Sequence, residues 1–235
     1  MNWERIGRRA AGRPWAARVL SRVEAEYRDT VVEIPGPELP SAWTHHYFCD
    51  DDGAPLRFEG DGHACTRCDR RYAGEPWDGA WRTRRHNEAA AQAQRAALLI
   101  RLAGEPPGEL ERILAGYDYL AYAPHGVNAG TGRVQPQSLD EAVWAIGLLR
   151  ALRWSGIAAP PGMETMASGV VDLLRPQVGG VHNIHCWLLA ALAECAALLR
   201  DRALLGWCGQ RVEEQVLSGF HPEGLWYEVN PHYHY

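Results

Sequence analysis

From residue 82 onward, apolar side chains recur mainly every three or four positions, the spacing that places them on one face of an α-helix. The first such run ends at Gly104, and the two prolines that follow mark a firm stop. Because the runs are joined by short turns, we expect antiparallel helical hairpins and a mainly α-helical chain. The apolar faces are Ala90, Ala93, Ala97 and Ile100; Leu110, Ile113, Leu114 and Tyr117; Leu139, Ala142, Val143, Ile146 and Leu149; Leu188, Ala191, Leu192, Cys195 and Leu199; and Leu205, Cys208, Val212 and Val216.

Several helix ends are also marked in the sequence. Ser138 to Glu141 has the pattern of a capping box, in which the first hydroxyl and the last carboxylate each bind a free amide of the first turn. A helix over roughly 162–174 should stop at Arg175, because the proline that follows disfavours a helical residue before it. Asp201 can cap the last helix. No internal repeat is evident, so periodicity alone does not decide between a bundle, a solenoid and an α/α toroid.

Size and composition exclude several classes of protein. A chain of 235 residues with 46% apolar and 23% charged residues is typical of a globular protein with one main unit. The net charge of −5 gives no basic surface for nucleic acid. No apolar run approaches the roughly 20 residues of a membrane span. Charges also interrupt every apolar run in residues 1–20, so we expect no export signal and a cytoplasmic location.

The composition changes twice along the chain. Residues 1–44 form an arginine-rich amphipathic segment and a proline-broken linker, and we expect a helical arm. Residues 45–81 are rich in His, Cys, Asp and Gly without a helical period, which predicts a small module of loops and strands. Residues 82–235 carry the helical runs. We therefore expect three parts with these boundaries.

The module holds a candidate metal site. Cys65 and Cys68 form a Cys-x-x-Cys pair, which is half of a tetrahedral zinc site, and Cys49 can supply a third thiolate. We expect a structural zinc in a zinc-ribbon-like fold, or else a degenerate ribbon that no longer binds metal, and we expect no organic cofactor. The fourth ligand stays open between Asp52, His63 and His46.

A second group of polar residues, His182 to Trp187, opens one of the helical runs. In a helix Asn183 and Trp187 lie one turn apart, and His182 and His185 are also neighbours. Asn183 can be a simple N-cap. A His-x-x-His metal pair is weaker, because no carboxylate partner is evident.

A third group lies at the end of the chain. The last residues, from Glu223 to Tyr235, are rich in tyrosine and histidine, which can donate and accept protons. Residues at a chain end can also be frayed.

Taken together, these motifs resemble those of bacterial heparinase II/III family polysaccharide lyases, especially the actinobacterial type. The resemblance runs from about residue 40 to the end of the chain. It is carried by Trp43-Thr44-His45-His46-Tyr47 with the cysteine module, Gly79 to Thr83 with His86-Asn87, Gln137 to Trp144, Asn183 to Trp187, and Glu223 to Glu228 followed by Tyr233-His234-Tyr235.

The resemblance implies an incomplete α/α toroid and β-elimination of a uronic-acid-containing polysaccharide. In this chemistry a proton beside the sugar carboxylate is removed while the 4-linked sugar leaves. Asn183 is the candidate that neutralises the carboxylate, with His185 beside it, Tyr233 as the proton carrier and Tyr235 as its alternative. Contacts to the acidic polysaccharide are expected from Trp187, Arg82, Arg133, His182 and Trp226.

Family members continue with more toroid helices and a β-sandwich, neither of which follows Tyr235 in this sequence. We therefore expect the N-terminal toroid portion of a lyase, with little turnover in isolation. Two other functions compete with this one. The first is a non-catalytic carbohydrate- or partner-binding helical module with a zinc ribbon. The second is a toroid glycoside hydrolase, which would need two carboxylates such as Asp140 and Glu141.

Overall fold

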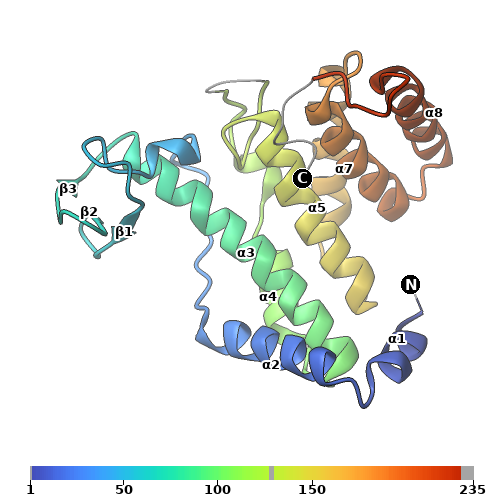
Figure 1. The fold of residues 1–235 in the computed structure, drawn as a ribbon, viewed down its shortest axis with the longest axis horizontal. Helices are drawn as coiled ribbons and strands as arrows, with labels where there is room; N and C mark the ends of the chain where they lie inside the picture. The colour runs from blue at the N-terminus through green and yellow to red at the C-terminus, as the bar shows by residue number, and fades with distance from the viewer. Residues whose placement is uncertain (1, 127–129, 229–235) are drawn as a thin grey trace.

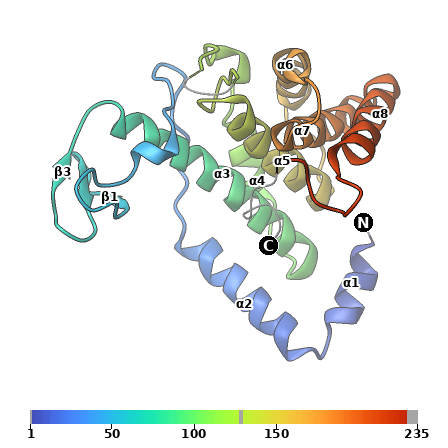
Figure 2. The same ribbon diagram turned by 45° about the horizontal axis from the view of Figure 1, so that its top comes forward.

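A computed structural model describes residues 2–126 and 130–228 of the chain (Figure 1). Eight α-helices and one small antiparallel sheet make up this described part, which confirms the prediction of a mainly helical fold with a small strand-containing module. The sheet lies at one end of the molecule, and helices α7 and α8 lie at the other (Figures 1 and 2).

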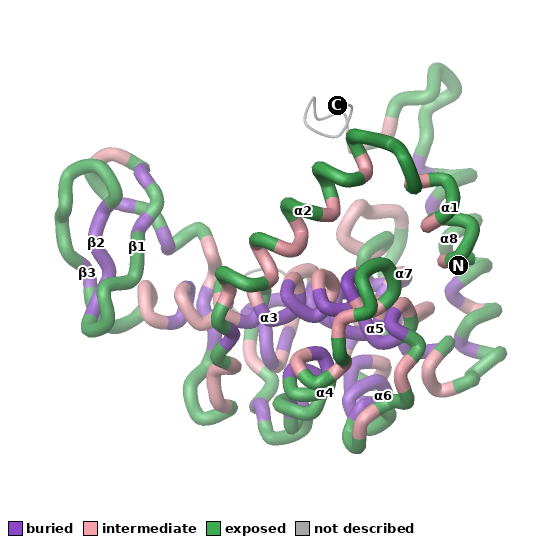
Figure 3. The backbone as a smooth tube through the Cα atoms, turned by 90° about the horizontal axis from the view of Figure 1, so that it is seen from below, coloured by how far each residue is buried: buried purple, intermediate pink, exposed green. Residues whose placement is uncertain are grey.

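The N-terminal arm consists of two helices, α1 (Trp3–Ala10) and α2 (Pro14–Asp29). Gly12 has a φ of +72° and Pro14 occupies the first turn of α2, so the chain turns sharply between the two helices. Neither helix has a buried residue, and Figure 3 shows α2 largely exposed. The linker behind the arm is tied to the helical body, because Ser41 Oγ donates to the Val134 carbonyl over 2.7 Å.

Helices α3 (Trp77–Leu102) and α5 (Ser138–Ser155) form the centre of the core. They pack closely because small residues line their contact. A Cβ atom on Gly147 of α5 would lie 2.9 Å from the Ala90 Cβ of α3, so this position accepts only glycine without movement of its neighbour. Figure 3 shows buried residues along both of these helices. Trp144 is fully buried and supplies the largest single side chain of this core.

The remaining helices are α4 (Gly108–Ala115), α6 (Met163–Leu174), α7 (Asn183–Leu199) and α8 (Arg202–Gly219). Three short 3-10 segments cover Thr44–His46, Tyr119–Ala121 and Arg175–Gln177. Helix α5 lies between α3 and α7, while α6 and α8 both pack on α7. The described helices thus pack in the order α3, α5, α7, with α6 and α8 on α7. The α/α toroid stays a prediction.

Most of the predicted helix ends agree with the structure. Helix α6 stops at Leu174, directly before Arg175, and the Asp201 side chain caps α8 by accepting from the Leu204 amide over 2.9 Å. The prediction of a capping box at Ser138 to Glu141 was wrong. Gln137 holds the N-cap position of α5, and its side chain makes no cap bond to the part of the chain that the structure describes. The Glu141 carboxylate instead accepts the amides of two loop residues that precede the helix, Gln135 at 2.8 Å and Arg133 at 3.2 Å.

Glu141 should make the stability of the helical body depend on pH. Burial raises the pKa of this carboxyl from 4.5 to about 7, even though the Gln135 amide lowers it. Between these two values the unfolded chain releases its proton and the folded chain keeps it, so stability falls as pH rises from about 4.5 through 7. Glu141→Gln should remove this loss. Its free energy of unfolding relative to wild type should therefore increase by on the order of 3 kcal/mol as pH rises from 4.5 to 8. Urea unfolding at several pH values measures it, and a difference that does not change with pH would contradict the prediction.

Candidate metal centre and helix-end site

The small sheet holds the cysteine-bearing loops in place. Strands β1 (Leu56–Phe58), β2 (His63–Cys65) and β3 (Arg71–Tyr72) are antiparallel and pair in sequence order. Leu56 lies opposite Cys65, so the end of β2 is fixed beside the loop that carries Cys49. Helix α3 begins at Trp77, four residues before the predicted end of the module, and its Ala80 belongs to the small core under the sheet.

Four side chains of this module converge on one point. The ligand atoms of Cys49, Asp52, Cys65 and Cys68 all lie within 4.8 Å of one another. The Sγ atoms of Cys49 and Cys68 are 3.7 Å apart, and the Cys65 Sγ is 3.4 Å from the nearer Asp52 oxygen. Bonds of about 2.3 Å to a tetrahedral metal place two sulfurs about 3.8 Å apart. The cluster therefore has the geometry to hold a metal ion.

Hydrogen bonds around the cluster favour ionised ligands. The amides of Arg67 and Cys68 point at the Cys65 Sγ, at 3.3 and 3.4 Å. The hydrogen bond from the Tyr72 hydroxyl, 3.2 Å from the Cys49 Sγ, lowers the pKa of that thiol. The Ala54 amide likewise lowers the pKa of the Asp52 carboxyl.

The third thiol of the cluster, Cys68, responds to the negative groups around it. The Arg70 amide lowers the pKa of Cys68, but the other thiols, burial and Asp52 outweigh it and raise the pKa to about 12. Several negative groups within a few ångström cannot all ionise unless a positive charge compensates them. A bound cation would supply that charge.

His63 and His46 lie outside the cluster. The two ring nitrogens of His63 are already bonded, one to the Tyr47 hydroxyl and the other to the Asp78 carboxylate, each over 2.8 Å. The choice of fourth ligand therefore falls on Asp52, and the expectation that His63 could replace it was wrong.

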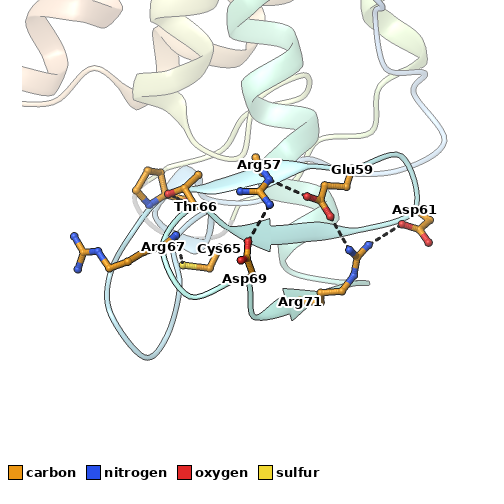
Figure 4. Close-up of polar contacts among 9 residues, drawn as sticks. Arg57, Glu59, Asp61, Cys65, Thr66, Arg67, Asp69 and Arg71 are labelled. Atoms are coloured by element: carbon orange, nitrogen blue, oxygen red, sulfur yellow. Dashed lines mark hydrogen bonds and ion pairs between the residues drawn. The ribbon is translucent and has the colours of Figure 1, made fainter.

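Ion pairs cross the outer face of the sheet (Figure 4). Arg57 on β1 contacts Glu59 and Asp69, and Arg71 on β3 contacts Glu59 and Asp61, all between 2.6 and 3.0 Å. Each pair is exposed and worth little alone. Glu59 nevertheless pairs with both arginines, so the network links β1 and β3, the two outer strands of this short sheet.

The second group of predicted residues meets at the start of α7. His182 is the N-cap, because its Nδ1 accepts from the Ile184 amide over 3.1 Å, so the alternative that Asn183 caps the helix was wrong. The Asn183 Oδ1 is buried and has no hydrogen-bond partner among the described residues. His185 bonds the backbone on the other side, with its Nδ1 2.7 Å from the Gly180 carbonyl. Trp187 is 46% exposed.

The chain returns to this helix end through residues 219–228. Glu228 Oε2 accepts from the backbone N–H of Asn183 over 3.2 Å and from Trp226 Nε1 over 2.6 Å. The Tyr227 hydroxyl donates to the Val181 carbonyl over 2.6 Å. The predicted approach of the terminal segment to the start of α7 is thus seen as far as Glu228. Tyr233 and Tyr235 lie outside the described residues.

Two residues that sequence reasoning missed support this arrangement. Buried Gln215 of α8 accepts from the His182 amide and donates to the Gly180 carbonyl, both over 2.9 Å. Glu228 appeared in the sequence only as part of a motif, yet its second oxygen also lies 3.5 Å from the His182 ring. A pocket of about 440 Å³ opens beside the terminal segment; Trp226 lines it and Asn183 does not.

The two predicted substrate arginines are engaged elsewhere. Arg82 donates to the Pro40 carbonyl and pairs with Glu75, which fixes the linker on α3. Arg133 donates to the Tyr122 carbonyl over 2.7 Å. Both therefore act as structural contacts in this conformation.

Comparison with known proteins adds no assignment. No protein-family model matches the chain, and no curated protein matches it. None of the helices within residues 2–126 and 130–228 is long and apolar enough to cross a membrane.

Proposed function

We propose that this chain is the helical portion of a polysaccharide lyase that cleaves a uronic-acid-containing polysaccharide by β-elimination. The observation that carries the proposal is the hydrogen bond from the backbone N–H of Asn183 to the Glu228 carboxylate. This contact brings two motifs 45 residues apart to one helix end. A lyase needs such a meeting, because the carboxylate neutraliser and the proton carrier must reach the same sugar ring.

In the proposed reaction, Asn183 binds the carboxylate of the uronate. Removal of the neighbouring proton pushes negative charge into that carboxylate, so a polar group that is already in place lowers the barrier. The NH2 group of Asn183 would make this contact, because it donates hydrogen bonds whereas the Oδ1, which is buried without a partner among the described residues, can only accept them. Tyr233 would carry the proton, with Tyr235 as the alternative, and His185 would border the sugar.

The candidate metal site has a different role from the helix-end site. We propose that it is zinc, because three thiolates and one carboxylate suit this ion, and that it is structural. The cluster lies at the sheet end of the molecule and α7 at the opposite end (Figure 1). Zinc would therefore stabilise the module without touching the sugar that reacts.

The hydrolase alternative has less support. A hydrolase needs two accessible carboxylates, yet Glu141 is fully buried and bonded to loop amides. Asp140 is bonded to Gln137 over 3.0 Å.

Product analysis tests the proposed reaction. The full-length protein, incubated with polymers of glucuronate, galacturonate or mannuronate, should release an unsaturated sugar that absorbs in the ultraviolet. New reducing ends without that absorbance would indicate hydrolysis and refute the proposal. Binding of the polymers without any cleavage would favour the non-catalytic module.

A further inference from the structure

A pocket of about 680 Å³ lies where the cysteine-bearing module meets α3. The 3-10 segment Thr44–His46 and Phe48 form one side of it, and α3 contributes Trp81, Arg84, Arg85, Asn87 and Glu88. We propose that this pocket is a second binding site, for one anionic sugar residue of the polysaccharide. The choice of a sugar rests on the proposed function, whereas the choice of an anion rests on the charges of the pocket itself.

Arg84 is the main reason to expect an anion. Its side chain is exposed and makes no ion pair or hydrogen bond within residues 2–126 and 130–228. Its guanidinium carbon lies 4.9 Å from the centre of the Tyr47 ring, and Tyr47 is held in turn by His63. A guanidinium that rests on an aromatic ring loses little freedom on binding, and its planar N–H groups match a carboxylate or sulfate.

The other charges of the pocket leave it positive. Arg85 pairs with Glu33 at 3.6 Å and donates to the Val31 carbonyl over 3.2 Å, and the Glu33 side chain is 85% exposed, so water screens the pair. Glu88 is the one acidic residue of the lining, and Arg95 neutralises it from outside the pocket over 2.9 Å. The pocket is thus a local positive site in a chain whose net charge is −5.

The uncharged groups suit a sugar ring. Phe48 is 41% exposed and offers an apolar surface to the C–H face of a pyranose. Asn87 Oδ1 accepts from Gln135 Nε2 over 2.9 Å, which turns its NH2 group outward as a donor for a hydroxyl. Trp81 is a wall and not a stacking platform, because Tyr47 and Phe58 already stack on it, at 5.5 and 5.2 Å between ring centres.

Titration with short oligosaccharides tests the site. The probes are tetrasaccharides of glucuronate and of galacturonate, with cellotetraose as the neutral control, and the readouts are calorimetry and the NMR signals of the Trp81 indole. Arg84→Ala should weaken binding of an acidic tetrasaccharide by about tenfold or more, which is the usual cost of losing a hydrogen bond to a charged group. The affinity of Arg84→Lys for the acidic tetrasaccharide should lie between those of wild type and Arg84→Ala, because lysine keeps the charge and loses the planar guanidinium. Arg18→Ala, at an exposed position of α2, is the matched control and should bind as wild type does.

The outcomes separate this proposal from the proposed function. Binding that weakens in Asn183→Ala but not in Arg84→Ala would overturn the second site and leave the site at α7 standing. Equal weakening in Arg84→Ala and Arg18→Ala would show general charge attraction and overturn it too. If no acidic tetrasaccharide binds wild type at millimolar concentration, the second site is refuted, and the release of an unsaturated product from polymer decides the lyase proposal independently.

Discussion

Cys65→Ser should cost the protein its bound metal and unfold the small module, while helices α3 to α8 stay folded. The module buries few side chains of its own around strands of two or three residues, and units this small usually need a metal or disulfides. For structural zinc, the free energy of binding, about 10–16 kcal/mol in finger peptides, is also free energy of folding. Cys65 is fully buried and its Sγ accepts two amides, so its loss should be felt more than that of exposed Cys68.

Metal analysis and hydrogen exchange together measure this effect. Wild type should bind about one zinc per chain, as expected for a single four-ligand site. Cys65→Ser should bind little, and amides of β1 to β3 should lose protection while those of α5 keep it. Cys186→Ser, which changes an exposed thiol of α7, is the control and should keep its zinc. Unchanged zinc content in Cys65→Ser would show that the cluster is not the site.

Asp52 gives a second test of the same centre. Asp52→Ala removes the carboxylate and should weaken zinc binding, whereas Asp52→Cys completes a four-thiolate site and should tighten it, because zinc favours thiolates. Competition with a coloured chelator measures both affinities. If Asp52→Ala binds zinc as wild type does, the fourth ligand is not Asp52.

The helical part of the fold could be predicted from the sequence because periodicity and caps are local signals. The three- and four-residue spacing marked α3, α5, α7 and α8, and Asp201 was recognised as a cap. Local patterns fail where a side chain has a better partner elsewhere. Glu141 matches a capping box, yet it binds the amides of a preceding loop, because that loop folds over the helix start and needs acceptors.

The sequence indicated part of the candidate metal centre. Thiol spacing pointed to Cys65 and Cys68, and to Cys49 with them. Spacing could not choose the fourth ligand, because the choice depends on where each side chain lies in the folded sheet. His63 stands two residues before Cys65, about 6.6 Å along an extended strand, and α3 supplies Asp78 to bind its ring.

The helix-end site was harder to foresee. The sequence indicated Asn183 and the terminal motif, but not the groups that hold them together. Gln215 of α8 and Glu228 act through contacts that cross 33 and 45 residues of sequence. No single-sequence pattern encodes such a contact, because it arises only when α7 and α8 pack side by side.

Asn183→Ala should lower turnover of a uronate polymer by about 100- to 1,000-fold while substrate binding changes far less, because losing one group that stabilises developing negative charge costs that much. Asn183→Asp should be at least as damaging, since it places a negative charge against the sugar carboxylate. Both variants should fold, because the side chain is only partly buried and His182 caps the helix.

Steady-state rates of ultraviolet absorbance with the complete protein measure the effect, and chemical unfolding checks that the variants are intact. Asp201→Ala is the matched control. It removes the cap of α8 and should cost about 1 kcal/mol of stability, yet it lies at the far end of α7 from Asn183, roughly 26 Å along a helix of 17 residues. Its turnover should therefore match wild type wherever the protein is folded. Equal losses in Asp201→Ala and Asn183→Ala would attribute the effect to stability alone, and unchanged turnover in Asn183→Ala would remove this helix end from the reaction.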